Sequence, residues 1–276
     1  KLLWRRKTHD DFDAREGYFG AGSSPLIWQD RVIVNVGGFR TQSAVVAFAM
    51  SSGDTLWHVY DDHASYSSPR IATIDGQTRL LVETRLNFLV IDPAQGTVDG
   101  EFPFGGRGPT VNGANPVLVG PHIFLTASYG IGAVLAKLTA TSATELYRTD
   151  DLYSSQYCTP VTDGEALYGI DGRQDGPPGE LKCIDPIARR TLWSVPNFGY
   201  GTLLLADGKL VIARTDGTLV LAAANREGFE QLATAKVLPG TLRALPALSN
   251  GRLFVRDETT FKCLQIGTTP PPEKSP

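Results

Sequence analysis

A motif that recurs at a nearly constant interval constrains the fold of this 276-residue chain more than any other feature. Each copy is a short apolar strand, a polar turn and a second strand with an aromatic residue, as in Val46–Trp57, Val90–Phe102 and Cys183–Trp193. A weaker copy ends at Tyr147, and the chain opens on a matching end, Leu2-Leu3-Trp4. The interval of about 45 residues lies in the range of roughly 40–50 that is typical of four-stranded propeller blades.

A second motif precedes each hairpin: a residue followed by proline leads, after a few residues, to another apolar strand. The pairs are Ser24-Pro25, Ser68-Pro69, Asn115-Pro116, Thr159-Pro160 and Leu245-Pro246. Proline is compatible with the start of a strand, where no ladder hydrogen bond is needed from its nitrogen. The two motifs give six units of four short strands without helical periodicity. They predict an all-β propeller of four-stranded blades, six visible, over residues 1–267.

The two ends of the chain leave the number of blades open. The last unit has three strands and ends at Cys263–Gly267, whereas Lys1–Arg5 reads as a fourth strand without its first three. Either this N-terminal strand completes the last blade and removes the free sheet edges, or the sequence is a fragment of a longer propeller. The composition of Thr268–Pro276, with three consecutive prolines, predicts a disordered tail.

The hairpin motif, of the type Ala/Cys-x-Asp-x-x-x-Gly-x-x-x-Trp, resembles the PQQ-like β-propeller repeat. Quinoprotein dehydrogenases and BamB-type outer-membrane assembly lipoproteins share that repeat, so the resemblance indicates the fold better than the function. It implies that the recurring aromatics dock neighbouring blades: Trp4, Trp57 and Trp193 match the tryptophan of the repeat, and Phe102 and Tyr147 are substitutes. Similar proteins usually have seven or eight blades, which favours the fragment interpretation, and are mostly periplasmic, which implies export.

Composition and charge exclude several classes of protein. With 42% hydrophobic residues the chain can bury a core, so wholesale disorder is excluded. A net charge of -3 argues against a nucleic-acid-binding protein and against a polybasic membrane surface. No apolar run reaches the length of about 18 residues that a transmembrane helix needs.

The cysteines Cys158, Cys183 and Cys263 are too far apart in sequence for a CxxC site, and no histidine pair has zinc-ligand spacing. We therefore expect buried free thiols and no metal. The quinoproteins that the chain resembles often carry an adjacent-cysteine disulfide beside the cofactor, which this chain lacks. No cofactor is expected, with PQQ and calcium at the propeller mouth as the alternative.

One set of polar side chains is a candidate ligand site. In a four-stranded blade, the loop into the first strand and the loop between the second and third strands open on one face, which we call the mouth. Besides Tyr18-Phe19, the sequence places there Asp61, Asp62, Asp150, Asp151, Arg85, Arg107, Arg173, Arg243, Arg256, Tyr66 and Tyr157. Guanidinium groups bind carboxylates in a bidentate fork, so the set suits a small anionic ligand. Alternatively, the aspartates and arginines neutralise one another across blades.

Three functions follow from these observations. The first in rank is a non-catalytic, exported propeller that serves as a binding or assembly scaffold for another protein. The second is a quinoprotein-like dehydrogenase with PQQ at the mouth. The third is a protein that binds carbohydrate or a polyanion at the same place.

Overall fold

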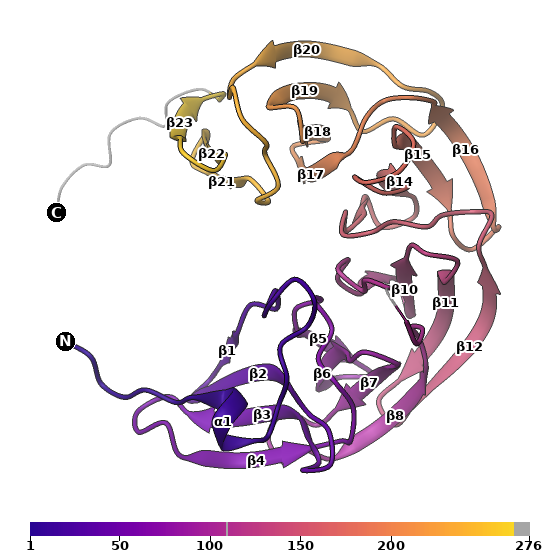
Figure 1. The fold of residues 1–276 in the computed structure, drawn as a ribbon. Helices are drawn as coiled ribbons and strands as arrows, with labels where there is room; N and C mark the ends of the chain where they lie inside the picture. Colours follow the sequence, from indigo (N-terminus) through magenta and orange to yellow (C-terminus); the bar gives the residue numbers. More distant parts are fainter. Residues whose placement is uncertain (109, 268–276) are drawn as a thin grey trace, which may run out of the picture. The chain divides into compact units, whose positions relative to one another are not determined.

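Antiparallel β-sheets built from strands consecutive in sequence make up the computed structural model, which describes residues 1–108 and 110–267 (Figure 1). Five sheets have four strands and one has three, so the prediction of an all-β propeller with four-stranded blades is confirmed. The described part contains one helix, α1 (Thr8–Asp11), and no helix long and apolar enough to cross a membrane. The predicted tail, residues 268–276, lies outside the described residues.

The chain divides into two compact units, of which the first contains residues 1–159 and 186–189. Its first sheet comprises β1 (Leu26–Trp28), β2 (Arg31–Gly38), β3 (Ser43–Ala49) and β4 (Thr55–Val59). The second comprises β5 (Arg70–Ile74), β6 (Gln77–Glu83), β7 (Asn87–Ile91) and β8 (Val98–Pro103). The third comprises β9 (Val117–Val119), β10 (His122–Ala127), β11 (Gly132–Thr139) and β12 (Ser142–Thr149).

The second unit contains residues 160–185 and 190–267 of the described chain. Its first sheet, the fourth along the chain, comprises β13 (Val161–Thr162), β14 (Leu167–Asp171), β15 (Glu180–Asp185) and β16 (Arg190–Val195). The fifth comprises β17 (Gly201–Ala206), β18 (Lys209–Arg214), β19 (Thr218–Ala223) and β20 (Gln231–Lys236). The sixth comprises β21 (Ala247–Ser249), β22 (Arg252–Arg256) and β23 (Phe261–Gln265).

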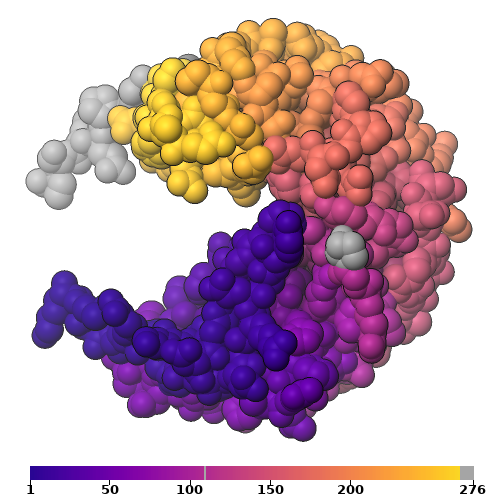
Figure 2. Space-filling model, in the orientation of Figure 1, coloured from indigo at the N-terminus to yellow at the C-terminus, as the bar shows by residue number. Residues whose placement is uncertain are grey.

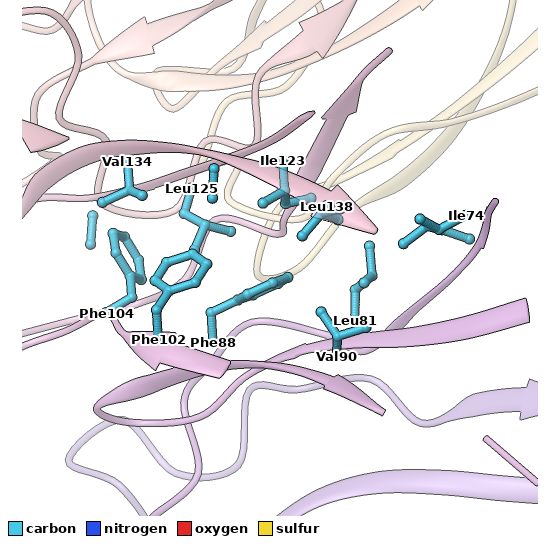
Figure 3. Close-up of a cluster of buried hydrophobic side chains, with 13 residues drawn as sticks. Ile74, Leu81, Phe88, Val90, Phe102, Phe104, Ile123, Leu125, Val134 and Leu138 are labelled. Atoms are coloured by element: carbon cyan, nitrogen blue, oxygen red, sulfur yellow. The ribbon is translucent and has the colours of Figure 1, made fainter. Parts of the chain in front are cut away.

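The core consists of apolar layers between neighbouring sheets. Figure 3 shows the layer between the second and third sheets, where Phe88, Phe102 and Phe104 face Ile123, Leu125 and Val134. A second layer joins the first and second sheets, and a third joins the fifth and sixth. Because the inner strands are covered on both faces, they are apolar almost throughout, as in β3 and β7, and do not alternate with polar residues.

The N-terminal segment packs against the first sheet, through Trp4, Arg6 and α1, and is drawn in indigo in Figure 2. The expectation that Lys1–Arg5 forms a strand is wrong for the described structure, since these residues belong to no sheet. Trp4 instead packs on the turn between β3 and β4, and Arg6 donates to the carbonyl of Gly53 at 2.8 Å. Completion of the last blade by this segment stays a prediction.

A β-bulge gives five sheets a common register in their outer hairpins. In each of these sheets, one residue of the fourth strand has no partner in the third strand. The residue that follows it in the fourth strand is paired with the third strand again. These following residues are Trp57, Gly100, Tyr147, Trp193 and Ala233. We call this place in the fourth strand the docking position.

Aromatic residues at the docking position donate a hydrogen bond to the turn between the third and fourth strands of the next repeat. Trp4 makes the same contact. The pairs are Trp4 Nε1 to Met50 O (2.8 Å), Trp57 Nε1 to Pro93 O (3.1 Å), Tyr147 Oη to Pro186 O (2.6 Å) and Trp193 Nε1 to Asn225 O (2.7 Å). Each ring is half-buried, so one side chain combines apolar packing with a satisfied N–H or O–H.

Two turns need glycine because the incoming ring lies against their backbone. A Cβ on Gly53 would stand 2.7 Å from the ring of Trp4, and a Cβ on Gly96 would stand 2.7 Å from the ring of Trp57. Both glycines also have positive φ, +78° and +75°, which other residues rarely adopt. The glycine of each motif therefore receives the tryptophan of the preceding repeat and not its own.

The junction between the second and third sheets uses different chemistry. Its docking position is Gly100, where a Cβ would lie 2.9 Å from the backbone nitrogen of Ala143 in the next sheet. The hydrogen bond comes from Arg79, whose Nε donates to the carbonyl of Ala140 at 2.7 Å. Phe102, the aromatic expected here, lies two residues beyond the docking position and is buried against Phe88 in the layer between the sheets.

Replacing a docking tryptophan should open one junction. We expect Trp57→Ala and Trp193→Ala each to lower the free energy of unfolding by about 2–4 kcal/mol, because a large, half-buried ring and its hydrogen bond are lost. The Phe variants keep a smaller aromatic ring without the N–H donor and should lose less, about 1–2 kcal/mol. Urea denaturation followed by circular dichroism measures both. Equal stability of the Ala variants and wild type would contradict the docking role.

Candidate functional site

The loops of the predicted mouth are held together by their own hydrogen bonds. Asp62, in the loop into the second sheet, is buried, and its carboxylate caps the turn between β6 and β7. It accepts hydrogen bonds from Thr84 Oγ1 (2.7 Å), Leu86 N (2.8 Å), Asn87 Nδ2 (3.0 Å) and His63 N (2.8 Å). With four donors, the Asp62 carboxylate is satisfied as a structural group.

Arg85 follows the same pattern, because backbone carbonyls of the next loop accept its hydrogen bonds. Its two terminal nitrogens donate to Thr110 O and Gly108 O, both at 2.6 Å. Its backbone nitrogen donates to His63 O at 2.8 Å, which ties this turn to the loop that carries Asp62. Asp62 and Arg85 thus make their hydrogen bonds to groups of the turns and loops around them, and neither is bonded to the other.

The other predicted residues of the first unit are more open to solvent. Asp61 is exposed, and its carboxylate accepts from the backbone nitrogen of Arg40 at 2.5 Å. Arg107, Asp150 and Asp151 are exposed as well. Asp151 accepts a hydrogen bond from Thr149 Oγ1, which lowers the pKa of its carboxyl. Tyr157 is half-buried beside the backbone of Gly113.

Three of the predicted arginines belong to the second unit. Arg243 donates through Nε to Gln174 Oε1 at 2.9 Å, which brings it to the loop that carries Arg173. Arg173 lies 3.5 Å from the carboxylate of Asp175, and Arg256 is exposed at the end of β22. Arg173 and Arg243 therefore share one loop region, and binding of an anion there stays a prediction.

Two aromatic residues stand out of the same loops in the first unit. Gly17, Tyr18, Phe19 and Gly20 form a tight turn, closed by the hydrogen bond from Gly20 N to Gly17 O at 2.9 Å. We call this turn, together with Tyr66, the aromatic turn. Tyr18 is 93% exposed and Phe19 is 64% exposed, although both are large. The turn thus presents two rings to solvent.

Tyr66 holds the aromatic turn in place. Its hydroxyl oxygen accepts a hydrogen bond from Phe19 N at 3.0 Å, and its ring lies 5.9 Å from that of Phe19. The rings of Tyr18 and Phe19 stack edge to face at 4.8 Å. A Cβ on Gly17 would stand 2.5 Å from the Tyr66 hydroxyl, so the approach of Tyr66 depends on glycine. The two exposed rings are therefore pre-ordered.

Glu83, at the end of β6, was not expected from the sequence. It is fully buried, and neither carboxyl oxygen has a hydrogen-bond partner among the described residues. Burial raises the pKa of Glu83 well above its ordinary value, because the charged form is poorly solvated there. Its signal in the sequence is an acid that directly follows the apolar run Leu80-Leu81-Val82.

Binding of PQQ with calcium at the mouth stays a prediction. The described residues include no group of three or more His, Cys, Asp or Glu side chains that could hold a metal ion. Cys158 and Cys183 are buried as expected, and burial raises the pKa of Cys183 to about 12, so its thiol stays protonated. The expectation of burial is wrong for Cys263, which is exposed because β23 is the last strand of a three-stranded sheet.

Comparisons with known proteins agree with this architecture. The profile of the family described as outer membrane protein assembly factor BamB matches residues 1–195. BamB from Moraxella catarrhalis is similar in structure, with a TM-score of 0.62 and 17% identity over 86% of this chain and 70% of that one. No curated protein matches the sequence.

Two further solved structures share the fold alone. A chain of the mitotic checkpoint complex has a TM-score of 0.57 and 12% identity, over 86% of this chain and 74% of that one. The computationally designed Ika8 protein has a TM-score of 0.51 and 11% identity, over 89% of this chain and 83% of that one. Such low identities carry no functional residue from these proteins to this chain.

Glu83 should make stability depend on pH. The folded chain raises its pKa above the unfolded value of about 4.3, so the folded state binds the proton more tightly. Stability is then lost as the pH rises through the range between those two pKa values. We expect Glu83→Gln to become more stable relative to wild type between pH 4 and pH 8.

Urea denaturation at several pH values measures this difference. The matched control is Glu227→Gln, which replaces an exposed acid and should leave the pH profile unchanged. A constant difference between Glu83→Gln and wild type across this range would show that folding does not raise the pKa of Glu83.

Proposed function

Because the chain belongs to the family of the outer membrane protein assembly factor BamB, we propose that it is a non-catalytic scaffold that binds another protein. The observation that supports this proposal most is the aromatic turn. Tyr18 and Phe19 expose large rings next to loops in which the buried Asp62 and the half-buried Arg85 already make hydrogen bonds within the chain. We further propose export from the cytoplasm, as the outer-membrane role named for the family suggests.

The chemistry of the aromatic turn fits a protein partner. Tyrosine and other aromatics are enriched among the residues that contribute most to protein–protein binding. Their rings bury a large area at a small entropic cost when they are already ordered. Tyr66 provides that order here through its hydrogen bond to Phe19 N. A partner that covers both rings would remove from water the apolar surface that the free chain exposes.

A photo-crosslinking experiment tests the proposal. A benzophenone amino acid replaces Tyr18 in the protein expressed in its native cells, and the same amino acid replaces Leu146 as the matched control. Leu146 is 51% exposed on β12, away from the aromatic turn. We expect a discrete crosslinked protein from position 18 that is absent from position 146.

Binding of the purified partner then gives the magnitude. Tyr18→Ser with Phe19→Ser should weaken the Kd by about 30-fold, or about 2 kcal/mol, as expected for residues at the centre of an interface. The Tm should change little, because both rings are exposed. An unchanged Kd, or no crosslink at position 18, would contradict a binding role for the aromatic turn.

A further inference from the structure

One docking position carries no ring. In β20 the unpaired residue of the bulge is Leu232, and the docking position after it is Ala233. The other fourth strands read Leu56-Trp57, Leu146-Tyr147 and Leu192-Trp193 at the same two places, and Asp99-Gly100 where Arg79 substitutes. Strand β20 thus has the leucine of the pattern, Leu232, but has Ala233 in place of the aromatic residue.

An apolar groove lies at this position, within the second unit. Its volume is about 780 Å³, and it runs between the fifth and sixth sheets. Ala233 and Leu221 line it from the fifth sheet, and Leu248, Leu253 and Leu264 line it from the sixth. Small-molecule sites in proteins have volumes of roughly 300–1,000 Å³ and mostly apolar walls. In both size and lining, the groove resembles such a site.

The occupied docking positions indicate which kind of group fits the groove. At the preceding junction, the indole of Trp193 packs against Phe229 of the next repeat and donates to a turn carbonyl. In the sixth sheet, Cys263 pairs with Phe254 as Cys183 pairs with Tyr168, so Ile266 corresponds to Pro186. The carbonyl of Pro186 is the acceptor for Tyr147. Ile266 also lines the groove, which therefore has apolar walls and the residue that corresponds to the acceptor of an occupied docking position.

We propose that this groove is a binding site for a planar aromatic ligand of about the size of indole. The ligand takes the place that a tryptophan side chain occupies at the other junctions, with its ring between Leu221 and Leu264. Binding there joins the fifth and sixth sheets, because the ligand contacts both. The residues that line the site belong to the second unit, whereas the aromatic turn belongs to the first.

Titration with indole tests the proposal. Saturable binding is measured by ligand-observed NMR for wild type, Ala233→Trp and Leu232→Trp. In Ala233→Trp the new side chain occupies the part of the groove beside position 233 where the ligand would bind, so binding should weaken at least tenfold, and the Tm should rise by about 2–4 °C. Leu232→Trp adds the same side chain at the neighbouring, 45% exposed position and should bind indole as wild type does.

Two results would overturn the proposal: no saturable binding of indole to wild type up to its solubility limit, or equal binding to wild type and Ala233→Trp. Ala233→Leu repeats the comparison with a smaller filler, in case the tryptophan variant does not fold. Ala233→Leu should also weaken binding, and affinity equal to that of wild type would likewise place the indole site outside the groove.

Discussion

The placement of one repeat on the next depends on a single side chain that does two things at once. Its ring covers the turn of the following sheet, and its N–H or O–H donates to a carbonyl of that turn, as with Trp57 and Pro93. Apolar layers between sheets supply most of the buried surface, but hydrophobic contacts are not directional and do not fix the orientation of one sheet on the next. The hydrogen bond and the glycine under the ring, such as Gly96, fix that orientation. Where the ring is absent, Arg79 or an open groove takes its place.

Much of this architecture could be predicted from the sequence, because the repeat interval and the apolar strands are local patterns. The partners of each motif could not. Gly53 and Trp57 stand four residues apart, yet Gly53 packs against Trp4 and Trp57 packs against Gly96. Phe102 has the expected spacing but lies two residues beyond the docking position, since the register depends on the bulge at Asp99. The docking position of β20 could not be recognised from the sequence, because Ala233 is not aromatic.

The candidate site divides in the same way. The aspartates, arginines and tyrosines of the mouth could be identified from the sequence, but their hydrogen bonds to the backbone could not be predicted from it. The structure shows that Asp62 accepts hydrogen bonds from a turn and that Arg85 donates hydrogen bonds to a loop. The exposure of Tyr18 and Phe19 depends on a turn four residues long and on Tyr66, which is distant in the chain. Glu83 alone had a readable signal, as an acid after three apolar residues.

Hydrogen–deuterium exchange of Trp193→Ala tests most directly whether each ring pins one junction. We expect faster exchange at amides of β16 and of the turn around Asn225, because that turn loses the ring and the hydrogen bond. Exchange in β2, β3 and β6 should match that of wild type, since neighbouring sheets of the first unit keep their own docks. Unchanged exchange around Asn225, or an equal increase over all sheets, would contradict junction-by-junction docking.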